Sequence, residues 1–279
     1  LAGEAVLDAL VGTKEPASIH PYGINLIGDY NVTGDMWQYK PILERIGIKI
    51  VATLSGDGRI EQIQQAHRAK LNVIVCAKSL ITLCRKMQER YGIPYVSVSF
   101  YGKRDTSNAI RSIVNAFGDE AMSKRAEMII AEEEAKLEAR LLPYREILKD
   151  KKAILNTGGN KSWSIASALQ DIGIEVVATS IRKATEEDIV IAKEYVPILM
   201  KVPANEQAKL IDEHHIDILL AGGRSLYTAL KKRVAFVDVN QEKKVSYGAY
   251  GGLENLAIDV CAALENPVFK LAGKTAPWE

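Results

Sequence analysis

Short sequence elements in the first half of the chain recur, in the same order, in the second half. The pairs that keep one constant offset are Trp37 with Trp163, Ile46-Gly47-Ile48 with Ile172-Gly173-Ile174, and Val51-Ala52-Thr53 with Val177-Ala178-Thr179. Two later pairs keep the order at larger offsets: Lys78-Ser79-Leu80 with Arg224-Ser225-Leu226, and Pro94-Tyr95-Val96 with Ala235-Phe236-Val237. This internal duplication predicts two domains of similar topology whose loops differ in length.

Apolar runs alternate with helical patterns, which is typical of βαβ units and parallel sheets. The run Leu71 to Val75 is apolar except at Asn72, and we interpret it as a strand buried on both faces. We predict further strands over residues 24–27, 48–54, 94–100, 153–156, 216–220 and 236–239, and helices over 34–46, 60–70, 80–91, 105–117 and 253–264. The sequence therefore predicts an α/β protein with two Rossmann-like parallel-sheet domains.

A long charged segment, residues 119–150, lies between the two halves. It reads as one helix joining the domains, with a solvated charged face and an interruption at Pro143. Its apolar stripe is predicted at Met128, Ile129, Leu137, Leu141 and Leu142. The expected organisation is an N-terminal helix and linker (1–21), a first Rossmann-like domain (22–118), the connecting helix (119–150) and a second Rossmann-like domain (151–279).

The composition excludes several classes of protein. A formal net charge of +1 gives no support for a nucleic-acid partner, and no apolar stretch approaches the ~20 residues that span a bilayer. The first residues lack the basic start of a signal peptide, and the first residue is Leu, which suggests a piece of a longer product. Three cysteines without a CxxC pair favour a reducing, cytoplasmic location.

Cys76 follows directly after the apolar run Leu71 to Val75. Ligands of parallel sheets bind beyond the carboxyl ends of the strands, so this thiol is expected at a site. The nearby Lys78 ammonium would favour the thiolate, which is the form that attacks and binds metal. A small buried cysteine acting as a hydrophobic residue explains the same pattern. From the residues alone, both interpretations stand.

The second half carries glycine-rich loops after two predicted strands. Gly158 and Gly159 precede Lys161 at the start of a helix, where backbone approach and an anion site are possible. The spacing is neither a Walker A loop nor GxGxxG, so a plain tight turn is an equal alternative. Neither the four histidines nor any other residues form a recognised zinc or hydrolase motif.

Several stretches taken together resemble the nitrogenase component 1 family, and within it the cofactor-assembly members related to the catalytic α chain. They cover residues 20–265 in family order: INLIGDYNVTGDMW, SGDGRIEQIQQAHRAKLNVIVCAKSL, ERYGIPY, SFYGKRDTS, TGGNKSWSIASALQDIGIEVVAT, AGGRSLYTALKKRVAFVDVNQE and YGAYGGLENL. The resemblance implies that the chain starts after an N-terminal domain whose cysteines bind a second iron–sulfur cluster in the family.

The resemblance also implies a cofactor site. Cys76 matches the cysteine that binds the terminal iron of the iron–molybdenum cofactor, and is the one metal ligand expected here. Asn240 stands where the catalytic chain has the histidine that binds molybdenum, and a carboxamide is a poor substitute for imidazole. The remaining expected cofactor-binding residues match cations, a hydroxyl and glycines around the cluster: Lys78, Ser79, Gly158, Gly159 and Lys161.

The cysteine ligand is kept at Cys76 and the histidine ligand is replaced by Asn240. The resemblance therefore implies a scaffold that holds an iron–sulfur precursor for maturation with molybdenum and homocitrate, rather than a catalyst. It further implies a heterotetramer with a related partner subunit, and exchange with the nitrogenase iron protein and a cluster-donor protein. The alternatives are a catalytic α chain that reduces dinitrogen, a vanadium-system assembly homologue, and a generic Rossmann-type binder of a nucleotide or metabolite. Cys84 and Cys261 match no family ligand and are predicted core residues.

Overall fold

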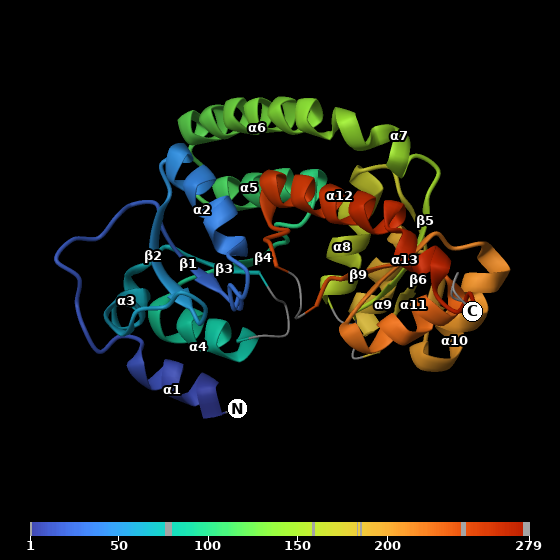
Figure 1. The fold of residues 1–279 in the computed structure, drawn as a ribbon. Coiled ribbons are helices and arrows are strands. Elements are labelled where there is room, and N and C mark those ends of the chain that lie inside the picture. Colours follow the sequence, from blue (N-terminus) through green and yellow to red (C-terminus); the bar gives the residue numbers. More distant parts are fainter. Residues whose placement is uncertain are drawn as a thin grey trace. The chain divides into compact units, whose positions relative to one another are not determined.

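Both halves of the chain fold into parallel sheets with helices between successive strands (Figure 1). The computed structural model describes residues 2–75, 80–157, 160–182, 184, 186–240 and 244–275. The chain divides into two units. The first comprises Leu1–Phe100, Arg104–Lys136 and Gly248–Tyr250, and the second comprises Tyr101–Lys103, Leu137–Tyr247 and Gly251–Glu279.

The first sheet has four parallel strands in the order β2-β1-β3-β4. Every residue of the two inner strands is buried, which explains why their sequences are continuously apolar or nearly so. The strands are β1 (Gly23–Ile27), β2 (Lys49–Leu54), β3 (Leu71–Ile74) and β4 (Tyr95–Ser97). The helices of this half are α1 (Ala2–Leu10), α2 (Asp35–Ile46), α3 (Ile60–Gln65), the 3-10 turn η1 (Ala66–Arg68), α4 (Ile81–Tyr91) and α5 (Lys103–Asn115).

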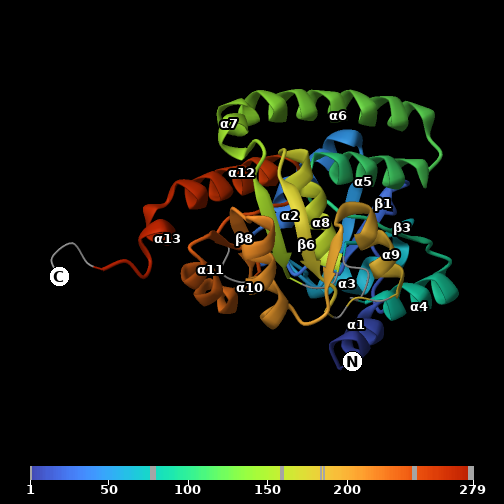
Figure 2. The same cartoon turned by 90° about the vertical axis from the view of Figure 1, so that its right-hand side faces the viewer.

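The second sheet has five parallel strands in the order β7-β6-β5-β8-β9, and Figure 2 shows α8, α10 and α11 around them. The strands are β5 (Lys152–Asn156), β6 (Glu175–Ser180), β7 (Ile198–Met200), β8 (Ile218–Ala221) and β9 (Ala235–Asp238). The helices are α8 (Asn160–Asp171), α9 (Glu186–Tyr195), α10 (Pro203–His214), the 3-10 turn η3 (Gly223–Ser225), α11 (Leu226–Lys232), α12 (Ala249–Glu265) and α13 (Pro267–Leu271). The predicted α/β fold with two all-parallel sheets is confirmed.

The strand order β2-β1-β3-β4 of the first sheet is repeated as β6-β5-β8-β9 in the second. The repetition extends to an irregularity of pairing. The register between β1 and β2 shifts between Ile24 and Asn25, and that between β5 and β6 shifts between Ala153 and Ile154. Gly47 and Gly173 follow α2 and α8 and both have positive φ, which glycine adopts without strain. The duplication read from the sequence is therefore a duplication of backbone structure.

One buried polar pair distinguishes the two cores. Asn25 on β1 donates its side-chain N–H to Asn72 Oδ1 on β3 and to the carbonyl oxygen of Ala66, both over 2.8 Å. Both asparagines are fully buried. The pairs of strands β1/β3 and β5/β8 align so that Asn25 and Asn72 correspond to Ile154 and Leu219. In the second core, the two equivalent positions are filled by apolar side chains.

The charged segment between the sheets forms α6 (Glu120–Leu141), the 3-10 turn η2 (Leu142–Tyr144) and the short helix α7 (Arg145–Leu148). The long helix and its interruption at Pro143 were predicted. The predicted apolar stripe is confirmed at Ile129, Leu137 and Leu141, which are buried, and is wrong at Met128 and Leu142, which are exposed. The charged face is also not simply solvated, because Glu132 and Glu133 pair with Arg45 of α2. Among the described helices, none is long and apolar enough to cross a membrane.

Residues 248–250 complete the first unit although they lie far along the sequence. The backbone N–H of Ala249 donates to the carbonyl oxygen of Phe100 over 2.6 Å, and that of Gly248 donates to Asp35 Oδ1 over 3.2 Å. The Tyr250 hydroxyl lies 2.9 Å from Ser107 Oγ. Burial raises the pKa of Tyr250 to about 12. We call these three residues the return strap.

Candidate functional site

The carboxyl ends of three neighbouring strands lie level at one edge of the second sheet. Asn156 ends β5, Ala221 ends β8 and Asp238 ends β9. In the strand register, Ala221 pairs with Asn156 on one side and with Asp238 on the other. Parallel α/β sheets bind ligands beyond this edge because loops of adjacent strands meet there. The second-half site residues predicted from the sequence follow two of these ends in the chain: Gly158, Gly159 and Lys161 come after β5, and Asn240 comes after β9.

Asn240 follows β9 after one intervening residue, and its side chain is exposed. Its backbone N–H donates to Asp238 Oδ1 over 2.8 Å, which closes a turn directly after the strand. The other carboxylate oxygen, Asp238 Oδ2, is buried and has no hydrogen-bond partner among the described residues. The structure therefore presents the Asn240 carboxamide at the edge and holds its backbone with Asp238.

A glycine pair after β8 lies beside these two side chains. A β-carbon added to Gly222 would lie 3.2 Å from Asn240 Nδ2, and one added to Gly223 would lie 3.3 Å from Asp238 Oδ2. Both distances are shorter than ordinary van der Waals contact. The absence of side chains at these glycines thus makes room for Asp238 and Asn240.

A hydrogen-bonded chain behind the edge involves a residue that the sequence analysis missed. Asn156 Nδ2 donates to Gln207 Oε1 over 3.1 Å, and Gln207 Nε2 donates to Thr228 Oγ1 over 3.2 Å. Gln207 comes from α10 and is 4% exposed. This chain of hydrogen bonds fixes the Asn156 side chain at the carboxyl end of β5. Nothing in the local sequence around Gln207 marks it, because its partners are distant in sequence.

The corresponding edge of the first sheet is bordered by a hydrogen-bonded loop after β1. Asp29 accepts hydrogen bonds through Oδ1 from the Asn31 N–H and through Oδ2 from the Tyr39 hydroxyl, both over 2.7 Å. At the neighbouring strand, the N–H of Val75 donates to the carbonyl oxygen of Ile27 over 2.9 Å. The backbone is therefore fixed up to the residue before Cys76.

The predicted site residues are described to different extents. Asn240 is placed in full, and Lys161 falls in the first turn of α8, where only its backbone is described. Five predicted residues lie outside the described residues: Cys76, Lys78, Ser79, Gly158 and Gly159.

The other two cysteines are buried, in agreement with the prediction that they are core residues. Burial raises the pKa of Cys84 to about 12 and that of Cys261 to about 11, which keeps both as thiols near neutral pH. Neither is suited to bind iron through a thiolate. Among the described residues, no group of three or more His, Cys, Asp or Glu side chains is arranged to hold a metal ion.

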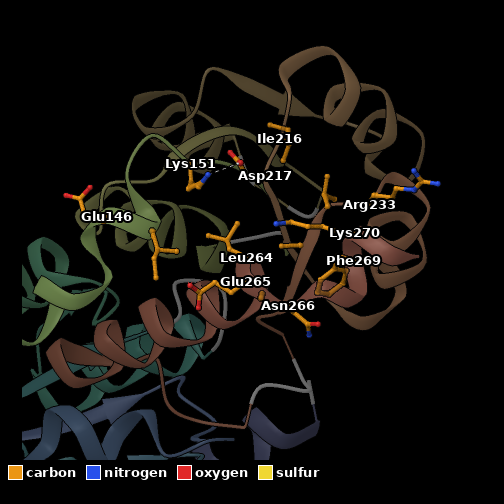
Figure 3. Close-up of a pocket in the computed structure, with 14 residues that line it drawn as sticks. Glu146, Lys151, Ile216, Asp217, Arg233, Leu264, Glu265, Asn266, Phe269 and Lys270 are labelled. Atoms are coloured by element: carbon orange, nitrogen blue, oxygen red, sulfur yellow. Dashed lines mark hydrogen bonds and ion pairs between the residues drawn. The ribbon is translucent and has the colours of Figure 1, made fainter. Parts of the chain in front are cut away.

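A hollow of about 460 Å³ lies at the opposite, amino-terminal edge of the second sheet (Figure 3). Its lining includes Lys151 and Asp217, whose Nζ and Oδ1 atoms are 3.4 Å apart, together with Phe269 and Lys270. Asp217 Oδ2 also accepts the backbone N–H of Lys152 over 2.8 Å, so this carboxylate is held by the start of β5. The hollow contains no thiol among its lining residues, and it lies away from the edge where Asn240 is found.

Chemically, the described residues at the carboxyl edge offer an exposed carboxamide at Asn240 and bare glycine backbone at Gly222 and Gly223. Oxygen donors of this kind bind soft metal centres weakly compared with thiolate or imidazole. Glycine backbone allows close approach of a large ligand. By themselves, the described residues of this edge do not form a complete metal site.

Comparisons with known proteins agree with this architecture. The profile of the family described as nitrogenase component 1 type oxidoreductase matches residues 1–265. The nitrogenase iron-molybdenum cofactor biosynthesis protein NifE of Nostoc sp. is 48% identical over 99% of this chain, and that of Rippkaea orientalis is 46% identical over 100%. The chain spans 58% and 60% of the length of these two relatives, respectively. A solved nitrogenase structure, "Nitrogenase Cp1 at pH 6.5", superposes with a TM-score of 0.85 at 23% identity, covering 100% of this chain and 64% of that one, which shows the shared fold.

Proposed function

Because this chain belongs to the nitrogenase component 1 type oxidoreductase family, we propose that it acts in cofactor assembly, holding an iron–sulfur precursor of the iron–molybdenum cofactor until the finished cluster is passed on. The relatives that share nearly half of its residues are named as cofactor biosynthesis proteins NifE, and the chain spans about 60% of their length. The proposal concerns the complete protein.

The observation that carries the proposal is the position of Asn240. The carboxamide is exposed at the carboxyl edge of the second sheet, on a turn closed by Asp238. By resemblance, a catalytic chain has a histidine ligand at this position. A carboxamide binds molybdenum or iron less well than imidazole does, so a cluster would be held by fewer strong bonds. Weak retention suits cargo that must leave, and it does not suit a catalyst that keeps its cofactor.

In this proposal the other site residues follow the resemblance. The Cys76 thiolate would hold one iron of the cluster, while Lys78, Ser79 and Lys161 would offset the negative charge of its sulfides. Cations and hydrogen-bond donors around a sulfide cluster lower its energy and tune it. Gly158 and Gly159 would let the backbone approach the cluster closely.

The partners and location are part of the same proposal. A NifN-type subunit would complete a heterotetramer, a cluster-donor protein would supply the precursor, and the nitrogenase iron protein would take part when molybdenum and homocitrate are added. We place this assembly in the cytoplasm, where reducing conditions keep thiols available.

The test is anaerobic co-expression of the complete protein with its NifN-type partner, comparing wild type, Cys76→Ala and Cys84→Ala. Cys84→Ala is the matched control because this thiol is buried in the core and its pKa is raised to about 12. We expect the precursor-cluster spectrum to disappear in Cys76→Ala only, with other iron retained. A wild-type complex that never binds the cluster would refute the proposal. Acetylene reduction by the purified complex would instead support the catalytic alternative.

A further inference from the structure

We propose that Asp238 and Gly222 are positioning residues that together set the direction of the Asn240 carboxamide toward the cargo. The inference rests on the proposed function and adds two residues to its site. Neither residue would contact the cluster in this role; both act through Asn240.

The first step is the hydrogen bond from the Asn240 backbone N–H to Asp238 Oδ1, at 2.8 Å. A charged acceptor makes such a bond stronger than one between neutral groups. The bond closes the turn after β9 and so fixes the backbone from which the Asn240 side chain projects. An asparagine at 238 could accept the same N–H through its carboxamide oxygen, whereas an alanine could not.

The second step is the contact between Asn240 and Gly222. A β-carbon at position 222 would lie 3.2 Å from Asn240 Nδ2 and 3.5 Å from Asn240 Cβ. The backbone at Gly222 has φ −84° and ψ 160°, a conformation open to any residue. Glycine is therefore needed here for space and not for backbone freedom. The carboxamide lies against the bare backbone of the turn, which limits its rotation.

The third step concerns the other oxygen of Asp238. Oδ2 is buried and has no donor among the described residues, which costs stability. It also lies close to Gly223, where an added β-carbon would be 3.3 Å away. The carboxylate is thus packed in place at a cost to stability. A role in fixing Asn240 explains why a hydrogen-bond acceptor stands at this position despite that cost.

The experiment uses the complete protein with its partner subunit and compares the electronic spectrum of the bound cluster, per iron, in wild type and variants. We expect Asp238→Ala and Gly222→Ala to reproduce the spectral shift of Asn240→Ala, and we expect no additional shift when either is combined with Asn240→Ala. Asp238→Asn should keep the wild-type spectrum. Two controls should also keep it: Glu213→Gln removes a charge from an exposed pair of the same unit, and Gly3→Ala adds a carbon where nothing lies within 4 Å.

Two outcomes would overturn the inference. In the first, Asn240→Ala shifts the cluster spectrum but Asp238→Ala and Gly222→Ala leave it as in wild type. In the second, Asn240→Ala itself leaves the spectrum unchanged. Crystal structures of the same variants give a second readout that needs no cluster. The Asn240 carboxamide should be displaced in Asp238→Ala and Gly222→Ala and retained in Asp238→Asn. An undisplaced carboxamide would refute the inference independently. A wild-type complex without cluster would refute only the proposed function.

Discussion

The ring of Tyr39 stacks on that of Phe100, with 4.0 Å between the ring centroids and 6° between the ring planes. Tyr39 comes from α2 and is 1% exposed, and its hydroxyl donates to Asp29 Oδ2 over 2.7 Å. The stack therefore holds the phenol where it can bind the loop after β1. A buried aromatic pair and one hydrogen bond fix the border of the first carboxyl edge.

Replacing Tyr39 by Phe should keep this stack and remove the hydrogen bond to Asp29. We expect a loss of about 1 kcal/mol in the free energy of unfolding, the usual net value of one such bond. Urea unfolding followed by circular dichroism measures it. Tyr227→Phe is the control, because Tyr227 is 81% exposed, and it should leave the midpoint unchanged. Equal midpoints for all three proteins would contradict the assigned role of Asp29.

The buried pair Asn25 and Asn72 should tolerate joint replacement better than single replacement. Asn25→Ile alone leaves the Asn72 carboxamide oxygen without its donor, which should cost about 1–3 kcal/mol of unfolding free energy. Adding Asn72→Leu copies the apolar arrangement of Ile154 and Leu219 and should recover part of the loss. Recovery stays partial because the carbonyl oxygen of Ala66 still loses a donor. Strictly additive losses in a double-mutant cycle would show that the two side chains are independent.

The pairing of α6 with α2 should be measurable as an interaction energy. Arg45 lies 2.5 Å from Glu133, whose side chain is 14% exposed. A double-mutant cycle with Arg45→Ala and Glu133→Ala should give a coupling of about 0.5–1 kcal/mol, near the top of the range for surface pairs. The exposed pair Lys209 and Glu213 should give a smaller coupling. High salt should reduce both. A larger coupling for the exposed pair would contradict the packing of α6 on α2.

Acid should weaken the ion pair that joins Glu15, in the segment after α1, to Arg68 of η1. The Arg68 guanidinium, with His67, lowers the pKa of Glu15 to about 2. Because this pKa is depressed in the folded state, the contribution of Glu15 is complete above its ordinary value of 4.5 and is lost as the pH falls toward 2. An NMR titration of the Glu15 carboxyl should show the low pKa, and Arg68→Ala should raise it. An unchanged pKa in Arg68→Ala would rule out this ion pair.

The thiols of Cys84 and Cys261 should be unreactive toward alkylation in the folded protein. Iodoacetamide at pH 8 should leave Cys84 and Cys261 unlabelled, because both are buried and burial raises their pKa values to about 12 and about 11. Unfolding in urea should expose both to labelling. Peptide mass spectrometry identifies the modified residues, and labelling of Cys76 in the same experiment measures how accessible the proposed ligand is. Rapid native labelling of Cys84 would contradict its place in the core.

The sequence was sufficient to predict most of the fold because apolar runs and glycine stops mark its elements directly. The strand predicted over Leu71 to Val75 is β3, which ends one residue earlier at Ile74, and Gly47 ends α2 as expected. Two strands were not predicted: β6 was noted only as the repeat of Val51-Ala52-Thr53 at Val177-Ala178-Thr179, and the edge strand β7 (Ile198–Met200) is too short to carry a pattern. Burial was harder to predict than position. The repeated tryptophans lie at matching places, yet Trp37 is 63% exposed and Trp163 is 6% exposed.

The residues of the candidate site also fall into those that the sequence identified and those that it did not. Asn240 was identified through the resemblance of its surroundings to a family, because a single asparagine after a strand carries no pattern of its own. Asp238 and Gly222 escaped prediction because their importance lies in contacts with Asn240 between two different strands' loops. Gln207 escaped for the same reason. Sequence periodicity reports which face of an element is buried, and it does not report which loop residues meet.

The return strap has a consequence for synthesis on the ribosome. The first unit takes Gly248–Tyr250 into its own structure, although its sheet is complete once Ser97 has been made. Until those three residues leave the exit tunnel, the Phe100 carbonyl and Asp35 Oδ1 lack the backbone donors that Ala249 and Gly248 provide. During synthesis, the first unit therefore lacks these two hydrogen bonds until nearly all of the second half of the chain has been translated.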